Sequence, residues 1–203
     1  MKNISVTVIP SFPLISKGDD LGEIVLKAAS KAALKFEDGD VLVVAQKVVS
    51  KAEGRLVKLE DINPSEEANI LAYETEKDPR LVQLILDEST KVVRKKQGVM
   101  IVRHKLGHVG ANAGIDQSNI EHSIEGSALL LPVSPDKSAR QLRDFFKERC
   151  GISIGVVISD SMNRPWRLGT VGEAIGCSGL TVLDDRRGET DMYARELKIT
   201  LIN

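Results

Sequence analysis

An apolar stretch that ends in an acidic residue is the first place where this chain could do chemistry. In "GVVISDSMNRPWR", Asp160 and Ser161 follow a run of strand-forming side chains. A carboxylate beside a hydroxyl supplies two hard oxygen ligands, which suits Mg²⁺ or Mn²⁺. Arg164 and Arg167 come next, and guanidinium groups beside a metal site favour recognition of phosphate or carboxylate. The alternative interpretation is an Asp-Ser turn with solvated arginines.

A second carboxylate stands in "NAGIDQSN", among small and amide-bearing residues. Taken alone, Asp116 fits a helix N-cap or an Asx turn. If Asp116 lies near Asp160 in space, the pair would bind a divalent ion, and Asn119 would be available to a nucleotide or a water molecule. The residues by themselves leave both interpretations open.

Two further stretches concentrate charge. "QKVVSKAEGR" places Gln46, Lys47 and Lys51 just after a buried run, where lysines and backbone amides could cradle phosphates, although exposed lysines usually bind nothing specific. "DDRRGETDMYAREL" is typical of a salt-bridged loop, with a second anion site as the alternative.

These residues must be positioned by strands and helices, which alternate irregularly along the sequence. This irregular order indicates a mixed α/β, or α+β, fold. We expect buried strands, a hairpin that turns near Gly98, and amphipathic helices, one of them stopped by Gly151. The expected strands cover 4–10, 41–50, 126–135, 152–160 and 178–185, the hairpin 91–110, and the helices 21–36, 63–77, 78–89 and 138–151.

Composition and charge disfavour several classes of partner and location. The 203 residues carry a net charge of −1 and only 3% aromatic side chains, which disfavours nucleic acid as a partner. No apolar run reaches the length of a membrane span, and the N-terminus does not have the pattern of a signal peptide. Two cysteines without metal-ligand spacing indicate reduced thiols in a cytoplasmic protein.

Three well-known site motifs are absent from the sequence. There is no GxxxxGK[ST], GxGxxG or HExxH pattern, and His104, His108 and His122 have no convincing ligand spacing. A nucleotide site in this chain would therefore have an unorthodox form.

Several ordered stretches together resemble one family, the coenzyme F-420-0:L-glutamate ligases, also called F-420 gamma-glutamyl ligases. The stretches occur in family order between about residues 8 and 197. They are "FPLISKGDDL", "FEDGDVLVVAQKVVSKAEGR", "NAGIDQSN", "GSALLLPVSPDKSA", "GVVISDSMNRPWRLGTVGEAIG" and "DMYAREL".

The resemblance implies an α+β fold with two intimately joined subdomains and a GTP-dependent ligase, typically a homodimer, that adds L-glutamate to a deazaflavin precursor. It implies a divalent metal, Mg²⁺ or Mn²⁺, with K⁺ as a further candidate. Matching by motif assigns contacts with GTP to Phe12, Pro13, Leu14, Ile15, Gln46, Lys47 and Lys51, and a nucleotide contact to Asn119. It assigns metal ligation to Asp116, Asp160 and Ser161.

The chemistry expected of such a ligase has two steps. Phosphoryl transfer from GTP gives an acyl phosphate, which the glutamate amine then attacks. The oxyanion of the second step needs a cation or hydrogen-bond donor, and we assign this role to Arg164 or Arg167.

The chain departs from the family pattern at Met162-Asn163, at Gly172-Glu173 and at its end, "ITLIN", beyond which the family usually continues. We therefore expect residues 1–203 to form a single ligase-like catalytic domain that is short at its C-terminus. The alternatives are a non-catalytic nucleotide- or metal-binding homologue, or a ligase of the same chemistry that acts on another small carboxylate.

Overall fold

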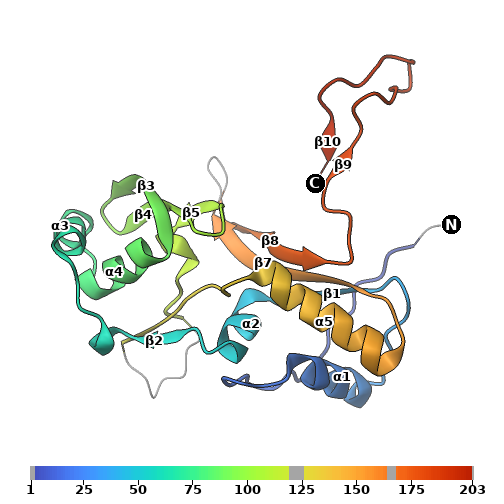
Figure 1. The fold of residues 1–203 in the computed structure, drawn as a ribbon, viewed down its shortest axis with the longest axis horizontal. Helices are drawn as coiled ribbons and strands as arrows, with labels where there is room; N and C mark the ends of the chain where they lie inside the picture. Colours follow the sequence, from blue (N-terminus) through green and yellow to red (C-terminus); the bar gives the residue numbers. More distant parts are fainter. Residues whose placement is uncertain (1–2, 119–125, 164–167, 203) are drawn as a thin grey trace.

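The computed structural model describes residues 3–118, 126–163 and 168–202, whose elements gather around two hydrophobic cores (Figure 1). The fold is α+β, as the sequence predicted. The α-helices are α1 (Leu21–Lys31), α2 (Gln46–Ala52), α3 (Glu66–Thr75), α4 (Pro79–Asp87) and α5 (Pro135–Cys150), and two 3₁₀ turns are η1 (Leu59–Asp61) and η2 (Asn112–Gly114). The strands are β1 (Val41–Ala45), β2 (Leu56–Lys58), β3 (Ser89–Lys96), β4 (Val99–His104), β5 (Val109–Ala111), β6 (Ser127–Leu129), β7 (Gly155–Asn163), β8 (Thr170–Ser178), β9 (Asp184–Asp185) and β10 (Leu201–Ile202).

The first core lies between helices α3 and α4 and the antiparallel sheet β3-β4-β5. Helix α3 begins where the Ser65 hydroxyl accepts a hydrogen bond from the amide of Ala68. Helix α4 begins one residue after Asp78, with proline at its first position, where a missing amide hydrogen costs nothing. Its apolar side chains then fall on one face and fill this core.

The second core lies under the mixed sheet β1-β7-β8, which is packed by α1, α2 and α5. All four phenylalanines pack in or against this core, with Phe146 fully buried and its ring centroid 4.7 Å from that of Phe36 and 5.6 Å from that of Phe145. Helix α5 ends at Gly151, whose φ of 75° is the left-handed conformation expected of a helix stop.

The register of this sheet determines what reaches its edge. Strand β1 runs parallel to β7, from the pair Val41 and Gly155 to the pair Ala45 and Ser159. Strand β7 continues past the end of β1 and pairs antiparallel with β8, so that Asp160 faces Glu173. The residues just after Ala45 and Ser159 therefore lie side by side.

A short antiparallel pair, β2 with β6, connects the two cores. Leu130, next to β6, belongs to the first core, and the backbone of β6 also carries the loop that follows η2. The β9–β10 ribbon extends away from the body of the molecule (Figure 1). In the described part of the chain, no helix has both the length and the apolar character of a membrane span.

Several predicted elements are confirmed. The hairpin forms from β3 and β4 and turns at Gly98, where φ is 77°. Strand β7 and helix α5 also occur where the pattern predicted them.

Four predicted strands are wrong in whole or in part. The run 126–135 is a strand only over β6, because Pro132 has no amide to donate to a ladder and helix α5 begins at Pro135. Residues 4–10 form no strand, and Ile4, Val6 and Val8 are 80 to 96% exposed, because alternation alone does not supply a neighbouring strand to pair with. The run 41–50 is a strand only to Ala45 and continues as helix α2, where packing against the sheet overrides the strand preference of the β-branched valines. The run 178–185 is replaced by β8, which ends at Ser178, and by the two-residue β9.

Candidate functional site

Lys47 comes to the edge of the mixed sheet because β1 turns directly into helix α2. Ala45 pairs with Ser159, so Gln46 and Lys47 begin the helix beside the point where β7 reaches Asp160. Gln46 is buried, and its side-chain oxygen accepts a hydrogen bond from the Ser50 hydroxyl at 2.9 Å. Gln46 thus stabilises the helix, while Lys47 extends from it.

Asp116 reaches the same place from the loop after η2. Its backbone amide donates to the carbonyl of Leu129 at 3.1 Å, and the amide of Leu129 donates back to the carbonyl of Asp116 at 2.8 Å. The turn before it has three successive residues with positive φ, Asn112, Ala113 and Gly114. Asp116 is therefore held by strand β6 at the end of a tight left-handed turn.

The two segments meet in an ion pair. The ammonium nitrogen of Lys47 lies 2.5 Å from Oδ2 of Asp116 and donates to the Ser118 hydroxyl at 3.2 Å. The other carboxylate oxygen, Oδ1, accepts the backbone amide of Ser118 at 2.6 Å, which is an Asx turn. Burial would raise the pKa of Asp116, but the hydrogen bonds from Lys47 and Ser118 outweigh it and lower the pKa.

Asp160 completes the group with a different environment. It is half-buried, and its Oδ1 accepts the backbone amide of Ser161 at 2.8 Å. Burial raises the pKa of Asp160, the hydrogen bond from the Ser161 amide opposes this, and the charge of Asp116 raises the pKa while that of Lys47 lowers it by less. The strand register and the charge effects of Asp116 and Lys47 together indicate that the two predicted carboxylates and Lys47 lie in one region.

The donor set suits a hard cation. Two carboxylates and the hydroxyl of the exposed Ser161 offer oxygen ligands, which are the ligands that Mg²⁺ and Mn²⁺ prefer. Across residues 3–118, 126–163 and 168–202, no group of three or more histidine, cysteine or acidic side chains could hold a metal ion. A protein that offers few ligands leaves positions for water and phosphate oxygens, which is the usual arrangement for Mg²⁺.

The other predicted residues are distributed more widely. Phe12 packs against the second core, Ile15 is half-buried, and Pro13 and Leu14 are exposed, Leu14 by 92%. Lys51 is half-buried one helical turn after Lys47, on the same face of α2. Asn119, Arg164 and Arg167 lie outside the described residues.

The charged stretch 184–197 behaves as a salt-bridged loop. Arg186 pairs with Asp184 and Glu189, and Arg187 pairs with Asp185 at 2.6 Å. These two arginines are therefore engaged with neighbouring acids, which favours the loop interpretation over a second anion site.

Two residues of the site were not predicted from sequence. Ser118, which binds both Lys47 and Asp116, belongs to the quoted "NAGIDQSN" motif but has no distinctive pattern of its own. Glu173 lies directly across from Asp160 on β8, a placement that only the strand register reveals.

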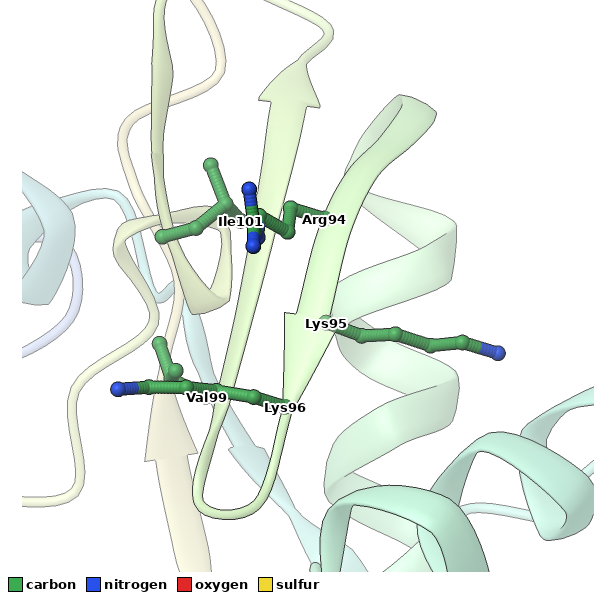
Figure 2. Close-up of a pocket in the computed structure, with 5 residues that line it drawn as sticks. All are labelled: Arg94, Lys95, Lys96, Val99 and Ile101. Atoms are coloured by element: carbon green, nitrogen blue, oxygen red, sulfur yellow. The ribbon is translucent and has the colours of Figure 1, made fainter.

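A surface pocket lies on the β3–β4 hairpin, away from this group (Figure 2). Its lining residues are Arg94, Lys95, Lys96, Val99 and Ile101. Figure 2 shows Lys95 extending to the opposite side of the hairpin from Lys96, and Lys95 forms an ion pair with Glu74 of α3. None of the predicted site residues lines it, so the candidate site remains the group around Asp116, Asp160 and Lys47.

The fold is α+β, and its candidate site holds two acids, Asp116 beside the first core and Asp160 beside the second. Residues 10–203 match the family model described as F420-0:Gamma-glutamyl ligase. Similar curated proteins include the coenzyme F420:L-glutamate ligases of Methanopyrus kandleri, 45% identical over 100% of this chain and 77% of the relative, and of Methanothermobacter thermautotrophicus, 41% identical over 98% and 78%. The Archaeoglobus fulgidus protein of the same name is 44% identical over 98% of this chain and 76% of the relative.

This chain therefore belongs to the F420-0:gamma-glutamyl ligase family. It spans about three quarters of the length of the relatives it matches.

Proposed function

We propose that this chain is a coenzyme F420:L-glutamate ligase, which uses GTP and a divalent cation to join L-glutamate to the carboxylate of a deazaflavin precursor. Family membership across residues 10–203 supports the ligase activity. The choice of site rests on one observation. Lys47 forms an ion pair with Asp116, and the charges of both act on Asp160, although the three residues come from separate parts of the chain. The proposal includes further glutamates added through γ-linkages.

Activation of the carboxylate is the difficult step, since an oxide ion is a very poor leaving group. In the proposed reaction the precursor carboxylate oxygen attacks the γ-phosphorus of GTP, GDP leaves, and an acyl phosphate forms. The glutamate amine then attacks the acyl carbon, the nitrogen loses a proton, and inorganic phosphate leaves with the electrons of the broken C–O bond. The products are the amide, GDP and phosphate.

Asp116 and Asp160, with the Ser161 hydroxyl, are the residues that would hold the cation. When bound, the cation would neutralise charge on the phosphates of GTP. Lys47 adds a positive charge at the same place, and Lys51 lies one turn further along α2. Phe12 to Ile15 are proposed to contact the nucleotide, and Arg164 or Arg167 to stabilise the oxyanion, on the basis of the family motifs.

Activity assays test the proposal directly. We expect GTP consumption in the presence of Mn²⁺ that requires both L-glutamate and the deazaflavin precursor, with a glutamylated product detected by mass spectrometry. Asp116→Asn should abolish turnover, whereas Asp61→Asn, an exposed acid on η1, should retain it. GTP binding without glutamate-dependent turnover would instead indicate a non-catalytic homologue, and turnover with other small carboxylates alone would indicate a different acceptor.

A further inference from the structure

Arg55 stands at the junction between the two cores and takes no part in the site described above. It follows helix α2 by way of Gly54, where φ is 69°, and precedes strand β2. Its side chain is only 22% exposed, which is low for an arginine and indicates a fixed position.

The guanidinium group of Arg55 joins two separate segments. Its Nε donates to the carbonyl of Leu131 at 2.8 Å, and its Nη2 lies 2.7 Å from Oε2 of Glu88, at the end of α4. Nε2 of His104 lies 3.6 Å from the same glutamate oxygen. A planar group that donates in two directions fixes the distance between its acceptors, which a lysine does less well.

The segment that Arg55 holds is the one that carries Asp116. The amide of Leu130 donates to the backbone carbonyl of Arg55 at 3.1 Å, so residues 130 and 131 are both attached to this residue. The preceding residue, Leu129, makes the two reciprocal backbone hydrogen bonds with Asp116. The side chain of Leu131 also packs closely on Gly114, where an added Cβ would lie 2.9 Å from it.

We propose that Arg55 is a positioning residue for the cation site, which it sets by anchoring residues 129–131 and thereby Asp116. The inference rests on the proposed role of Asp116 as a cation ligand. Arg55 touches neither substrate nor cation, and its effect on the site passes through the backbone of Leu129. Glu88 contributes by holding the guanidinium group in the direction of Leu131.

The first test measures backbone opening and does not depend on any ligand. In Arg55→Gln, amide hydrogen exchange at Asp116 and Leu129 should be faster than in the unchanged protein by about tenfold, because their shared bonds lose their anchor. The matched control is Arg80→Gln, since Arg80 also forms an arginine–carboxylate pair, with Asp78 at 2.6 Å, but lies on α4 and contacts none of residues 129–131 through this pair. Equal exchange at Asp116 and Leu129 in all three proteins would overturn the inference.

The second test measures Mn²⁺ affinity by calorimetry, well below the melting temperature of each variant. Removal of an outer partner of a metal ligand typically weakens binding about 10- to 100-fold, and we expect this for Arg55→Gln but not for Arg80→Gln. If Arg55→Gln does not fold, Arg55→Lys and Glu88→Gln replace it, with an expected loss of about tenfold each.

The outcomes separate the two proposals. If the unchanged protein binds Mn²⁺ and Asp116→Asn does not, the proposed cation site stands, and full affinity in the Arg55 variants would overturn only the positioning role. If the unchanged protein does not bind Mn²⁺, the proposed cation site fails, and the role of Arg55 toward it fails with it.

Discussion

Each of the two core regions contributes one aspartate to the candidate site, and the pKa values of these two acids are shifted in opposite directions. Asp116, which the first core region carries on a loop, is paired with Lys47 and has a lowered pKa. Asp160, on a strand of the second core, accepts one backbone amide and has a raised pKa. Asp116 thus has a basic partner within the protein, whereas burial and the charge of Asp116 favour the neutral form of Asp160.

This difference indicates how the site is divided between the two regions. The second core supplies rigid elements, a strand for Asp160 and a helix for Lys47, whereas the first supplies Asp116 on a turn that depends on its neighbours. A site assembled in this way is sensitive to anything that shifts one core relative to the other. Substitutions at the site and in each core test this division.

The largest effect is expected on cation-dependent nucleotide binding. Asp116→Asn and Asp160→Asn should each weaken GTP binding in Mn²⁺ by about 100-fold or more, because loss of a direct ligand exceeds the usual effect of an outer partner. Calorimetric titration with and without Mn²⁺ measures this, and circular dichroism checks that the fold is kept. Unchanged GTP affinity in both variants would contradict the proposal that Asp116 and Asp160 are metal ligands.

Truncation of each core tests whether the two regions fold as one unit. Phe146→Ala in the second core should lower the free energy of unfolding by about 3 to 5 kcal/mol, and Ile85→Ala in the first by about 2 to 5 kcal/mol, since both side chains are fully buried. Because β2–β6 and the Arg55–Glu88 pair connect the cores, we expect a single transition in denaturant. Two separate transitions by circular dichroism would show that the cores are independent.

Acid should lower the free energy of unfolding of the whole protein through groups that lie in the first core region. The pKa of His108 is lowered from 6.5 by burial and by the nearby His104, so stability falls as pH drops below 6.5, where the unfolded chain takes up the proton more easily. The pKa of Glu88 is lowered from 4.5 by His104 and Arg55, so its contribution is complete above 4.5 and is lost as pH falls through the folded value. The raised pKa of Asp160 acts in the opposite direction.

Denaturant unfolding between pH 7 and 4 measures this dependence. His108→Gln should flatten the part of the curve just below pH 6.5, whereas His104 should not be replaced in this test because its Nδ1 accepts the amide of Leu106. A curve for His108→Gln that matches the unchanged protein would contradict the assignment.

The smallest effect on stability is expected from the contact that joins the regions at the site. Lys47→Met should lower the free energy of unfolding by about 1 kcal/mol or less, since the ion pair with Asp116 is about 30% exposed on both sides. It should also raise Mn²⁺ affinity severalfold, because the ammonium group no longer competes for the carboxylate. Lys58→Met, which removes a more exposed pair with Glu60, is the control. A weaker Mn²⁺ affinity in Lys47→Met would show that the lysine orders Asp116 for the cation instead.

The local sequence pattern predicted the central elements of the second core correctly, but it failed for strand β8 and for the N-terminal segment. Strand β7, helix α5 and its stop at Gly151 follow from apolar runs and capping, which act within a few residues. Strand β8 was missed because Gly172, Gly176 and its small residues have low strand propensity, and it forms because β7 offers it a partner. The N-terminal alternation had the right period but no neighbour, so it forms no strand.

Some members of the candidate site were predicted from sequence, whereas Ser118, Glu173 and the geometry were not. Asp116, Asp160 and Lys47 carried recognisable chemistry, and the family resemblance grouped them. That one oxygen of Asp116 closes an Asx turn while the other meets Lys47 depends on the positions of three distant segments. Arg55 lies in the same charged stretch as Lys47 and Lys51 but had no predicted role of its own, and only the fold shows that Glu88 and Leu131 accept its hydrogen bonds.

The most direct test of the central claim, that acids from two cores share one cation, is a double-mutant cycle on Mn²⁺ affinity. Mn²⁺ binding is measured by electron paramagnetic resonance for the unchanged protein, Asp116→Asn, Asp160→Asn and the double variant, with Asp61→Asn as control. If both carboxylates hold the same ion, the double variant binds little worse than either single variant, because each change alone already destroys the site. Losses that simply add, or a site that survives either single change, would show that the two acids do not act on one cation.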